Sequence, residues 1–139
     1  MKTMPLLLTS LGTLVVDHEP IVSLRASDAS GSFGILPGHA DFLTALDIGV
    51  VSWRYADGRE KYCAVRRGVL SVAGGEVSVA TRDAILDDNL EHLEQTALGA
   101  FRARDDAERH ARTDSAQLEL KALRELMRYL QPAHGGNPP

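Results

Sequence analysis

The residue pattern changes once along the chain, near residues 83–88, and this change limits the fold more than any other feature. Before it, short runs rich in β-branched residues alternate with turn signals, which is typical of an antiparallel β-sandwich or barrel. After it, alanine, leucine, arginine and glutamate recur at helical spacing. The sequence therefore predicts an α+β chain that is mainly β, with an N-terminal antiparallel β-sandwich followed by a C-terminal antiparallel α-helical hairpin.

Turn signals divide the first part of the chain into strands. Asp57-Gly58 and Gly74-Gly75 are strong hairpin signals, because their glycines accept positive φ between two apolar runs. Residues 17–20, with the sequence Asp-His-Glu-Pro, are expected to form a turn between two further strands. Strands are therefore predicted at residues 6–10, 14–16, 21–26, 48–55, 59–65, 69–73 and 77–80.

The first helix is predicted to begin near Asn89, because Asp88 and Glu91 resemble a capping box. One apolar stripe runs along this helix and is interrupted by a single arginine. The stripe consists of Leu90, Leu93, Ala97, Phe101, Arg104, Ala107 and Ala111.

A second helix is predicted after a short break at residues 112–114, since Asp114 and Gln117 repeat the capping device. Pro132 would end this helix. Its apolar stripe consists of Ala116, Leu120, Leu123, Met127 and Leu130. The chain is thus expected to divide into a β-sandwich domain at residues 1–86, a helical hairpin at 87–132 and a disordered tail at 133–139.

Composition excludes several classes of protein. A net charge of −4 and a pI of about 5.7 argue against non-specific binding to nucleic acid or anionic lipid. The single cysteine, Cys63, rules out an internal disulfide framework. No run approaches the roughly 20 apolar residues of a membrane span, so we expect no direct membrane insertion. A phosphate-binding loop motif is also absent, which argues against a nucleotide hydrolase.

Residues 31–46 read GSFGILPGHADFLTAL, a run in which glycines and a proline punctuate apolar residues. Gly34, Pro37 and Gly38 are expected to shape the loop, because they mark bends or positive φ. This segment resembles a signature of the ε subunit of bacterial F-type ATP synthases. In that family a flattened β-sandwich precedes two helices, so the resemblance covers almost the whole chain.

The resemblance implies a non-catalytic subunit of the rotating central stalk, without a cofactor. It would bridge the γ subunit and the c-subunit ring, coupling ion flow to ATP synthesis. The helical hairpin would inhibit ATP hydrolysis when it extends toward the α and β subunits. The protein would be peripheral, on the cytoplasmic face of the bacterial inner membrane. The residues implied in the contact with the c ring are Ser30, Gly31, Ser32, Phe33 and His39.

Some members of this family bind ATP through an Ile/Leu-Asp-x-x-Arg-Ala motif. Leu86 and Asp87 match the start of that motif, whereas residues 88–91 do not supply the arginine and alanine. We therefore expect weak ATP binding or none. The departures from the family pattern at Ser32, Asp41 and residues 88–91 indicate a divergent branch, of which alternative, sodium-linked complexes are one example.

Two functions from other classes compete with the stalk subunit. The first is a small enzyme with His39 as general base or metal ligand, but no second histidine or cysteine lies at ligand spacing, so no metal site is expected. The second is a free-standing β-sandwich adaptor whose helical hairpin binds an unrelated partner. This adaptor remains the alternative, because its physical requirements are the same as those of a stalk subunit.

Overall fold

The computed structural model describes residues 2–130 of the chain, so the tail expected at residues 133–139 lies outside the described part. The chain divides into two compact units, Met1–Arg102 and Ala103–Pro139. The first unit contains all the strands and the beginning of the helical part. The second unit contains the remainder of the last helix.

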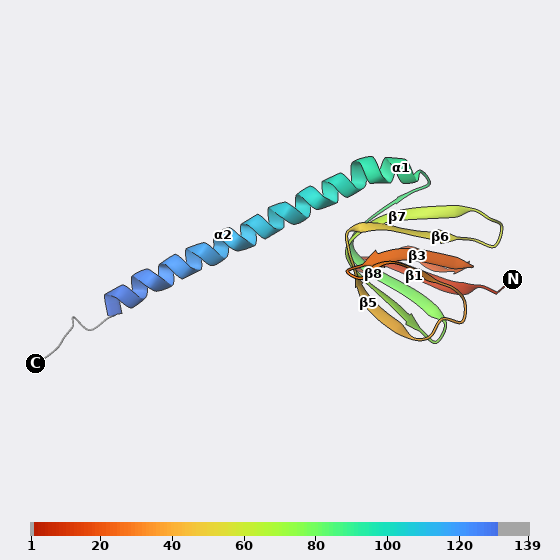
Figure 1. Ribbon diagram of the computed structural model, residues 1–139, viewed down its shortest axis with the longest axis horizontal. Helices are drawn as coiled ribbons and strands as arrows, with labels where there is room; N and C mark the ends of the chain where they lie inside the picture. The colour runs from red at the N-terminus through yellow and green to blue at the C-terminus, as the bar shows by residue number, and fades with distance from the viewer. Residues whose placement is uncertain (1, 131–139) are drawn as a thin grey trace, which may run out of the picture. The chain divides into compact units, whose positions relative to one another are not determined.

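Eight β-strands form the sandwich of the first unit (Figure 1). They pair in the order β2-β1-β8-β7-β5-β3-β4, and β6 pairs with both β3 and β7. All pairs are antiparallel except β1 and β8, which run parallel. The strands are β1 (Met4–Ser10), β2 (Thr13–Ile21), β3 (Ser23–Asp28), β4 (Gly31–Ile35), β5 (Phe42–Leu46), β6 (Gly49–Arg54), β7 (Glu60–Ala73) and β8 (Glu76–Asp87). The prediction of a mainly β chain with a sandwich is confirmed.

The strands differ from the prediction in several places: β4 and β5 are not among the predicted strands, and β8 continues to Asp87 instead of ending at residue 80. Residues 17–20 lie inside β2 and do not form a turn. His18 takes a φ of 51°, so the strand continues through a bulge at this residue. The two strands expected at 59–65 and 69–73 are one strand, β7, in which Arg67 takes a φ of 56° without a shift of register against β8. β7 pairs with β6 through its first half and with β5 through its second half.

The core of the sandwich consists of alternate side chains that point inward from the strands. Trp53 is fully buried, and its Nε1–H donates a hydrogen bond of 3.0 Å to Tyr55 Oη. Tyr55 in turn donates to the carboxylate of Glu19 at 3.1 Å. This chain of contacts satisfies the polar atoms of two large aromatic side chains, which would otherwise be costly to bury.

The N-cap of the helical part is Asn89, one residue after the predicted cap at Asp88. The Oδ1 of Asn89 accepts a hydrogen bond of 3.1 Å from the backbone N–H of His92. A single α-turn, α1 (Leu90–His92), passes through a π-helical turn, η1 (Leu93–Ala97), into the long helix α2 (Leu98–Leu130).

The helical hairpin predicted at residues 87–132 is wrong within the described residues, because α2 continues through the expected break at 112–114. Arg112, Thr113 and Asp114 include neither glycine nor proline, and such residues cost a helix only about 0.7 kcal/mol each at most. The second capping signal at Asp114 therefore does not interrupt the helix.

Candidate functional site

The turn between β3 and β4 carries Ser30, Gly31 and Ser32, and its shape is fixed by Asp28. One carboxylate oxygen of Asp28 accepts hydrogen bonds from the backbone N–H and the hydroxyl of Ser30, at 2.9 and 2.5 Å. The other accepts a bond of 2.6 Å from the hydroxyl of Thr44 on β5. These bonds, led by the one from the Ser30 hydroxyl, hold the pKa of Asp28 below its usual value. Asp28 thus ties an exposed turn to the neighbouring strand.

The loop between β4 and β5 carries the other residues of the glycine-rich segment. Gly38 has a φ of 88°, which accounts for a glycine at this position. The backbone N–H of His39 donates to the Leu36 carbonyl at 3.1 Å, and its ring Nδ1 lies 2.6 Å from the Ala40 carbonyl oxygen. The His39 ring also contacts Phe42 edge-on, with centroids 5.7 Å apart. His39 therefore has a structural role in the loop.

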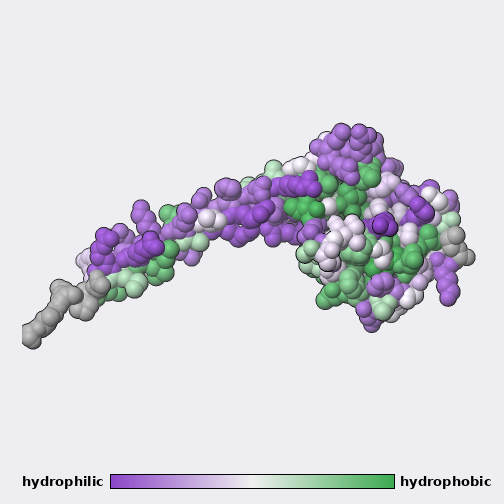
Figure 2. All heavy atoms as spheres, viewed as in Figure 1, coloured by the Kyte–Doolittle hydropathy of each residue, from purple (hydrophilic) through white to green (hydrophobic). Residues whose placement is uncertain are grey.

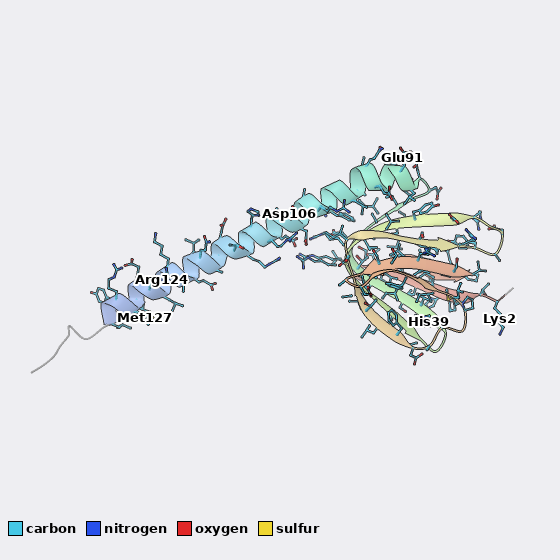
Figure 3. The ribbon with its side chains drawn as sticks, in the orientation of Figure 1. Lys2, His39, Glu91, Asp106, Arg124 and Met127 are labelled. Carbon is cyan, nitrogen blue, oxygen red and sulfur yellow. The ribbon has the colours of Figure 1, made fainter. Side chains whose placement is uncertain are left out.

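The structure does not gather the predicted contact residues into one patch. Ser30, Gly31 and Ser32 lie at the start of β4, whereas His39 lies beyond the end of β4. The length of this strand, about 13 Å, separates the two groups. Figure 3 places His39 at the same end of the sandwich as Lys2. Phe33 connects the two regions, since its ring lies 5.6 Å from Phe42, which also contacts His39.

A second candidate surface was not resolved by the sequence. Nine outward side chains, one of them from β2 and the others from β1, β5, β7 and β8, form a continuous patch without a charged residue, which we call the uncharged face. Arg67 and Arg82 border it, because they line one hollow together with Thr9 and Ala80. The strand register places them side by side: Leu43 opposite Ser71, Ala45 opposite Val69, and Thr9 opposite both Ala80 and Leu14. The uncharged face consists of Leu7, Thr9, Leu14, Leu43, Ala45, Val69, Ser71, Ser78 and Ala80.

Three side chains of the uncharged face are large, apolar and open to solvent. Leu43 is 71% exposed, Leu14 56% and Val69 46%. Figure 2 shows hydrophobic spheres over the part of the sandwich where Figure 1 draws β5. A contiguous exposed apolar patch on a sheet is typical of a surface that another protein covers.

The start of the helical part packs on the other side of the sandwich. Leu93, Ala97, Leu98 and Phe101 are buried against Ala64 of β7. The residues of the predicted first stripe differ in burial. Leu93, Ala97 and Phe101 are buried, whereas Leu90 is 38% exposed. This contact fixes the first helical turns within the first unit.

The two residues that match the ATP-binding motif lie at this junction. Leu86 is exposed near the end of β8. The Asp87 carboxylate accepts a hydrogen bond of 2.9 Å from the Asn89 backbone N–H and lies 2.6 Å from His92 Nδ1. These contacts, led by the Asn89 backbone bond, lower the pKa of Asp87. The carboxylate is therefore engaged in the start of the helix.

The second unit exposes the apolar stripe predicted for residues 116–130. Leu120, Leu123, Met127 and Leu130 are all exposed on α2, and Figure 3 labels Met127 beside Arg124. Nearer the start of this unit, Arg109 pairs with Asp105 at 3.2 Å and with Asp106 at 2.7 Å. The stripe is long enough to serve as a helical docking face.

The described residues offer neither a reactive cysteine nor a metal-binding cluster. Cys63 is buried, and burial raises the pKa of its thiol to about 12, so it is a poor nucleophile. Within residues 2–130, no three histidine, cysteine, aspartate or glutamate side chains are grouped closely enough to hold a metal ion. The same residues contain no helix of the length and apolarity that a membrane crossing requires.

Comparison with known sequences identifies proteins that are similar over most of the chain. Residues 3–87, more than half of the chain, match the family described as ATP synthase, Delta/Epsilon chain, beta-sandwich domain. The chain is 45% identical over 135 residues to "ATP synthase epsilon chain 2" of Paraburkholderia xenovorans (strain LB400), with 96% of each chain covered. It is 43% identical to "ATP synthase epsilon chain 2" of Cereibacter sphaeroides, covering 88% of this chain and 85% of the relative.

Comparison with solved structures shows the same fold. A chain of the Euglena gracilis mitochondrial ATP synthase (OSCP/F1/c-ring) superimposes with a TM-score of 0.62 at 24% identity, covering 76% of this chain and 66% of that one. A chain of the Tetrahymena thermophila mitochondrial ATP synthase (central stalk/c-ring) gives a TM-score of 0.51 at 15% identity, covering 61% and 69%. At these identities the similarity concerns the fold alone.

Proposed function

Because the chain belongs to the ATP synthase epsilon subunit family, we propose that it is a non-catalytic subunit of the central stalk. It bridges the γ subunit and the c-subunit ring, and so couples ion flow through the ring to ATP synthesis or hydrolysis. It is held at the cytoplasmic face of the bacterial inner membrane through the complex. The observation that carries this proposal is the uncharged face, which has the character of a permanently covered surface.

The γ subunit covers the uncharged face in this proposal. Interface cores are depleted in charged residues, and the nine side chains of this face include none. The face is a regular sheet surface over several strands, so it docks as a rigid body without ordering a loop. Leu43 and Val69 lie on paired strands and supply the largest apolar contact.

The c ring contacts the turn between β3 and β4. Ser30, Gly31 and Ser32 offer hydroxyl and backbone groups to polar loops, and Asp28 holds them in one conformation before contact. Such pre-ordering lowers the entropy cost of binding. Phe33 and His39 act indirectly, because their aromatic contacts with Phe42 support the strand and the loop that follow.

The exposed stripe of α2 is the regulatory element. Leu120, Leu123 and Met127 present an amphipathic helix face that contacts the α and β subunits when it lies within their reach. A helix held there obstructs rotation and inhibits ATP hydrolysis. ATP itself is not expected to bind tightly at Leu86 and Asp87, since the Asp87 carboxylate already serves the helix start.

A free-standing adaptor is the second candidate, and the same exposed stripe on α2 favours it. The two functions differ in their partner, so the test is a partner assay with a variant. Leu43→Glu places a charge in the uncharged face, and we expect it to reduce recovery of γ with the tagged chain at least about tenfold.

Leu126→Glu is the matched control, because it introduces the same charge at an exposed leucine of the second unit. It should recover γ as the unmodified chain does. Equal recovery of γ by Leu43→Glu and Leu126→Glu would remove the uncharged face from the proposal. Recovery of an unrelated protein without γ would favour the adaptor.

A further inference from the structure

A cavity of about 270 Å³ lies beside the helix start, on the side of the sandwich opposite the uncharged face. Its floor is the outer surface of β3, β4, β6 and β7, and its other wall is the beginning of the helical part. All of its lining residues belong to the first unit. We call it the Arg25 pocket; its residues are Arg25, Ala26, Ser27, Ser32, Val50, Ser52, Tyr62, Leu90, Glu94 and Leu98.

Hydrogen-bond donors gather on the sheet side of the Arg25 pocket. Arg25 lies opposite Ser52 on one neighbouring strand and opposite Gly34 on the other. Ser27, two residues along β3, lies opposite Ser32. Residues at directly opposed or alternate positions share one face of a sheet, so one guanidinium and three hydroxyls meet here. The sheet side contributes no carboxylate to the lining.

No other described part of the chain engages the side chains of these donors. Within residues 2–130 the side chains of Arg25, Ser27, Ser32 and Ser52 form no ion pair or hydrogen bond. Three other arginines of the sandwich are paired: Arg54 with Glu60, Arg59 with Asp57, and Arg66 with Asp83. An unpaired guanidinium beside hydroxyl groups is the usual recognition element for a carboxylate or phosphate.

Two glycines leave space for the donor side chains at the floor of the pocket. A Cβ at Gly34 would lie 4.0 Å from Arg25 Nη1, so the guanidinium extends over a strand position that has no side chain. A Cβ at Gly49 would come within 3.3 Å of the Ser27 hydroxyl oxygen, closer than most real contacts. Both positions leave room for the donors.

The opposite wall is mainly apolar. Leu90 and Leu98 from the helical part offer aliphatic surface, which Val50 of β6 continues on the sheet side, and Glu94 adds a single carboxylate at the helix side. A small ligand pocket typically combines such a wall with a few convergent polar groups. Glu94 would repel a second negative charge, so the site selects a ligand that is anionic at one end only.

We propose that the Arg25 pocket binds a small organic molecule with one oxyanion group, a carboxylate or a phosphate monoester, and an apolar body. The oxyanion meets Arg25 and the serine hydroxyls, and the apolar body lies against Leu90 and Leu98. Because one wall belongs to the helix start, such a ligand stabilises the packed arrangement of α1 and η1 on β7. The pocket shares Ser32 with the turn proposed above to contact the c ring, so this inference concerns the chain while that turn is uncovered.

The test is a titration of the ¹⁵N-labelled full-length chain with four probes: phenyl phosphate, benzoate, inorganic phosphate and benzyl alcohol. We expect phenyl phosphate or benzoate to give saturable amide shifts at Ser27, Ser32, Ser52 and Leu98, with a Kd below about 1 mM. Whichever of these two binds more tightly identifies the preferred oxyanion. Inorganic phosphate should bind more weakly because it lacks the apolar body, and benzyl alcohol should give no saturable shift.

Two variants make the titration decisive. Arg25→Ala should weaken binding at least about tenfold, since an exposed side chain can be removed without unfolding the sandwich. Arg82→Ala, an exposed arginine of β8 outside the pocket, is the control and should leave the Kd unchanged. The proposal is overturned if neither organic anion saturates, if both variants bind equally, or if inorganic phosphate or benzyl alcohol binds as tightly as the organic anions.

Discussion

At the scale of single residues, the protein places polar groups where they fix backbone geometry. Asp28 ties a turn to a strand, Asn89 caps a helix, and Tyr55 satisfies the indole of Trp53. Each of these side chains has short contacts with groups that would otherwise lack a partner. Their removal should therefore have local and measurable effects.

Asp28→Asn should make the melting temperature of the sandwich less dependent on pH between about pH 3 and pH 7. The folded-state pKa of Asp28 lies below the usual 3.8, so its ionised form contributes stability above that value and loses it as the pH falls through the folded pKa. The wild type should have the higher melting temperature at about pH 7, and the difference should shrink by about pH 3. Thermal unfolding at several pH values measures this. A difference that stays constant with pH would contradict the assigned hydrogen bonds.

Tyr55→Phe should destabilise the sandwich by about 1–3 kcal/mol, because it leaves the buried Trp53 N–H without its acceptor. Tyr62→Phe is the control. Its hydroxyl bonds to Glu60 at the surface, so its loss should cost less than about 0.5 kcal/mol. Urea unfolding of the two variants compares them directly. Equal losses would mean that the Trp53 contact has no special weight.

At the scale of elements, the sequence predicted what local chemistry determines. The Asp57-Gly58 and Gly74-Gly75 turns, the sandwich and the helical start near Asn89 follow from glycine, capping and alternation. The positive φ of His18 and of Arg67 could not be predicted, because a left-handed conformation of a non-glycine residue comes from tertiary pairing. The break expected at 112–114 rested on a capping signal that helix propensity outweighs.

The candidate site was predictable only in part for a similar reason. The segment from Gly31 to Leu46 is continuous in sequence, yet it folds as a strand, a loop and a returning strand. Its two ends, Gly31 and Leu46, both lie beside Asp28, whereas His39 lies in the loop at the far end of β4, so Ser32 and His39 do not share a patch. The uncharged face comes from five strands, and only the register reveals that Leu43, Val69 and Thr9 belong together.

Phe101→Ala should loosen the helix start from the sandwich. Phe101 is 2% exposed and packs in the cluster around Ala64, so its truncation should cost about 3 kcal/mol of local stability. Hydrogen exchange at Leu93 and Ala97 should accelerate, while amides of β1 and β8 keep their protection. Leu126→Ala, at an exposed position, should leave exchange at these sites unchanged. Accelerated exchange throughout the sandwich in the Phe101 variant would show that the helix start is not a separate stabilising element.

At the scale of the whole molecule, the two units carry different tasks in the proposed function. The first unit contains the uncharged face and the turn held by Asp28, so it should suffice for assembly. The second unit contains the exposed stripe of α2, which is the proposed regulatory element. Truncation separates these tasks.

Deletion of residues 103–139 should leave a folded sandwich that still assembles with γ, because the cluster around Phe101 is retained. ATP hydrolysis by the assembled complex should rise or stay unchanged. Deletion of residues 87–139 should also assemble, but with lower thermal stability, since it exposes Ala64 and its neighbours. Loss of coupled ATP synthesis through failed assembly in both truncations would place essential contacts on the helix.

The most direct test of the central claim is affinity purification of the tagged full-length chain from its native membranes, followed by identification of the proteins recovered. We expect the γ subunit, the c ring and the α and β subunits to be recovered together, and we expect Leu43→Glu but not Leu126→Glu to abolish their recovery. Recovery of the chain alone, or with an unrelated partner and without γ, would contradict its assignment to the central stalk.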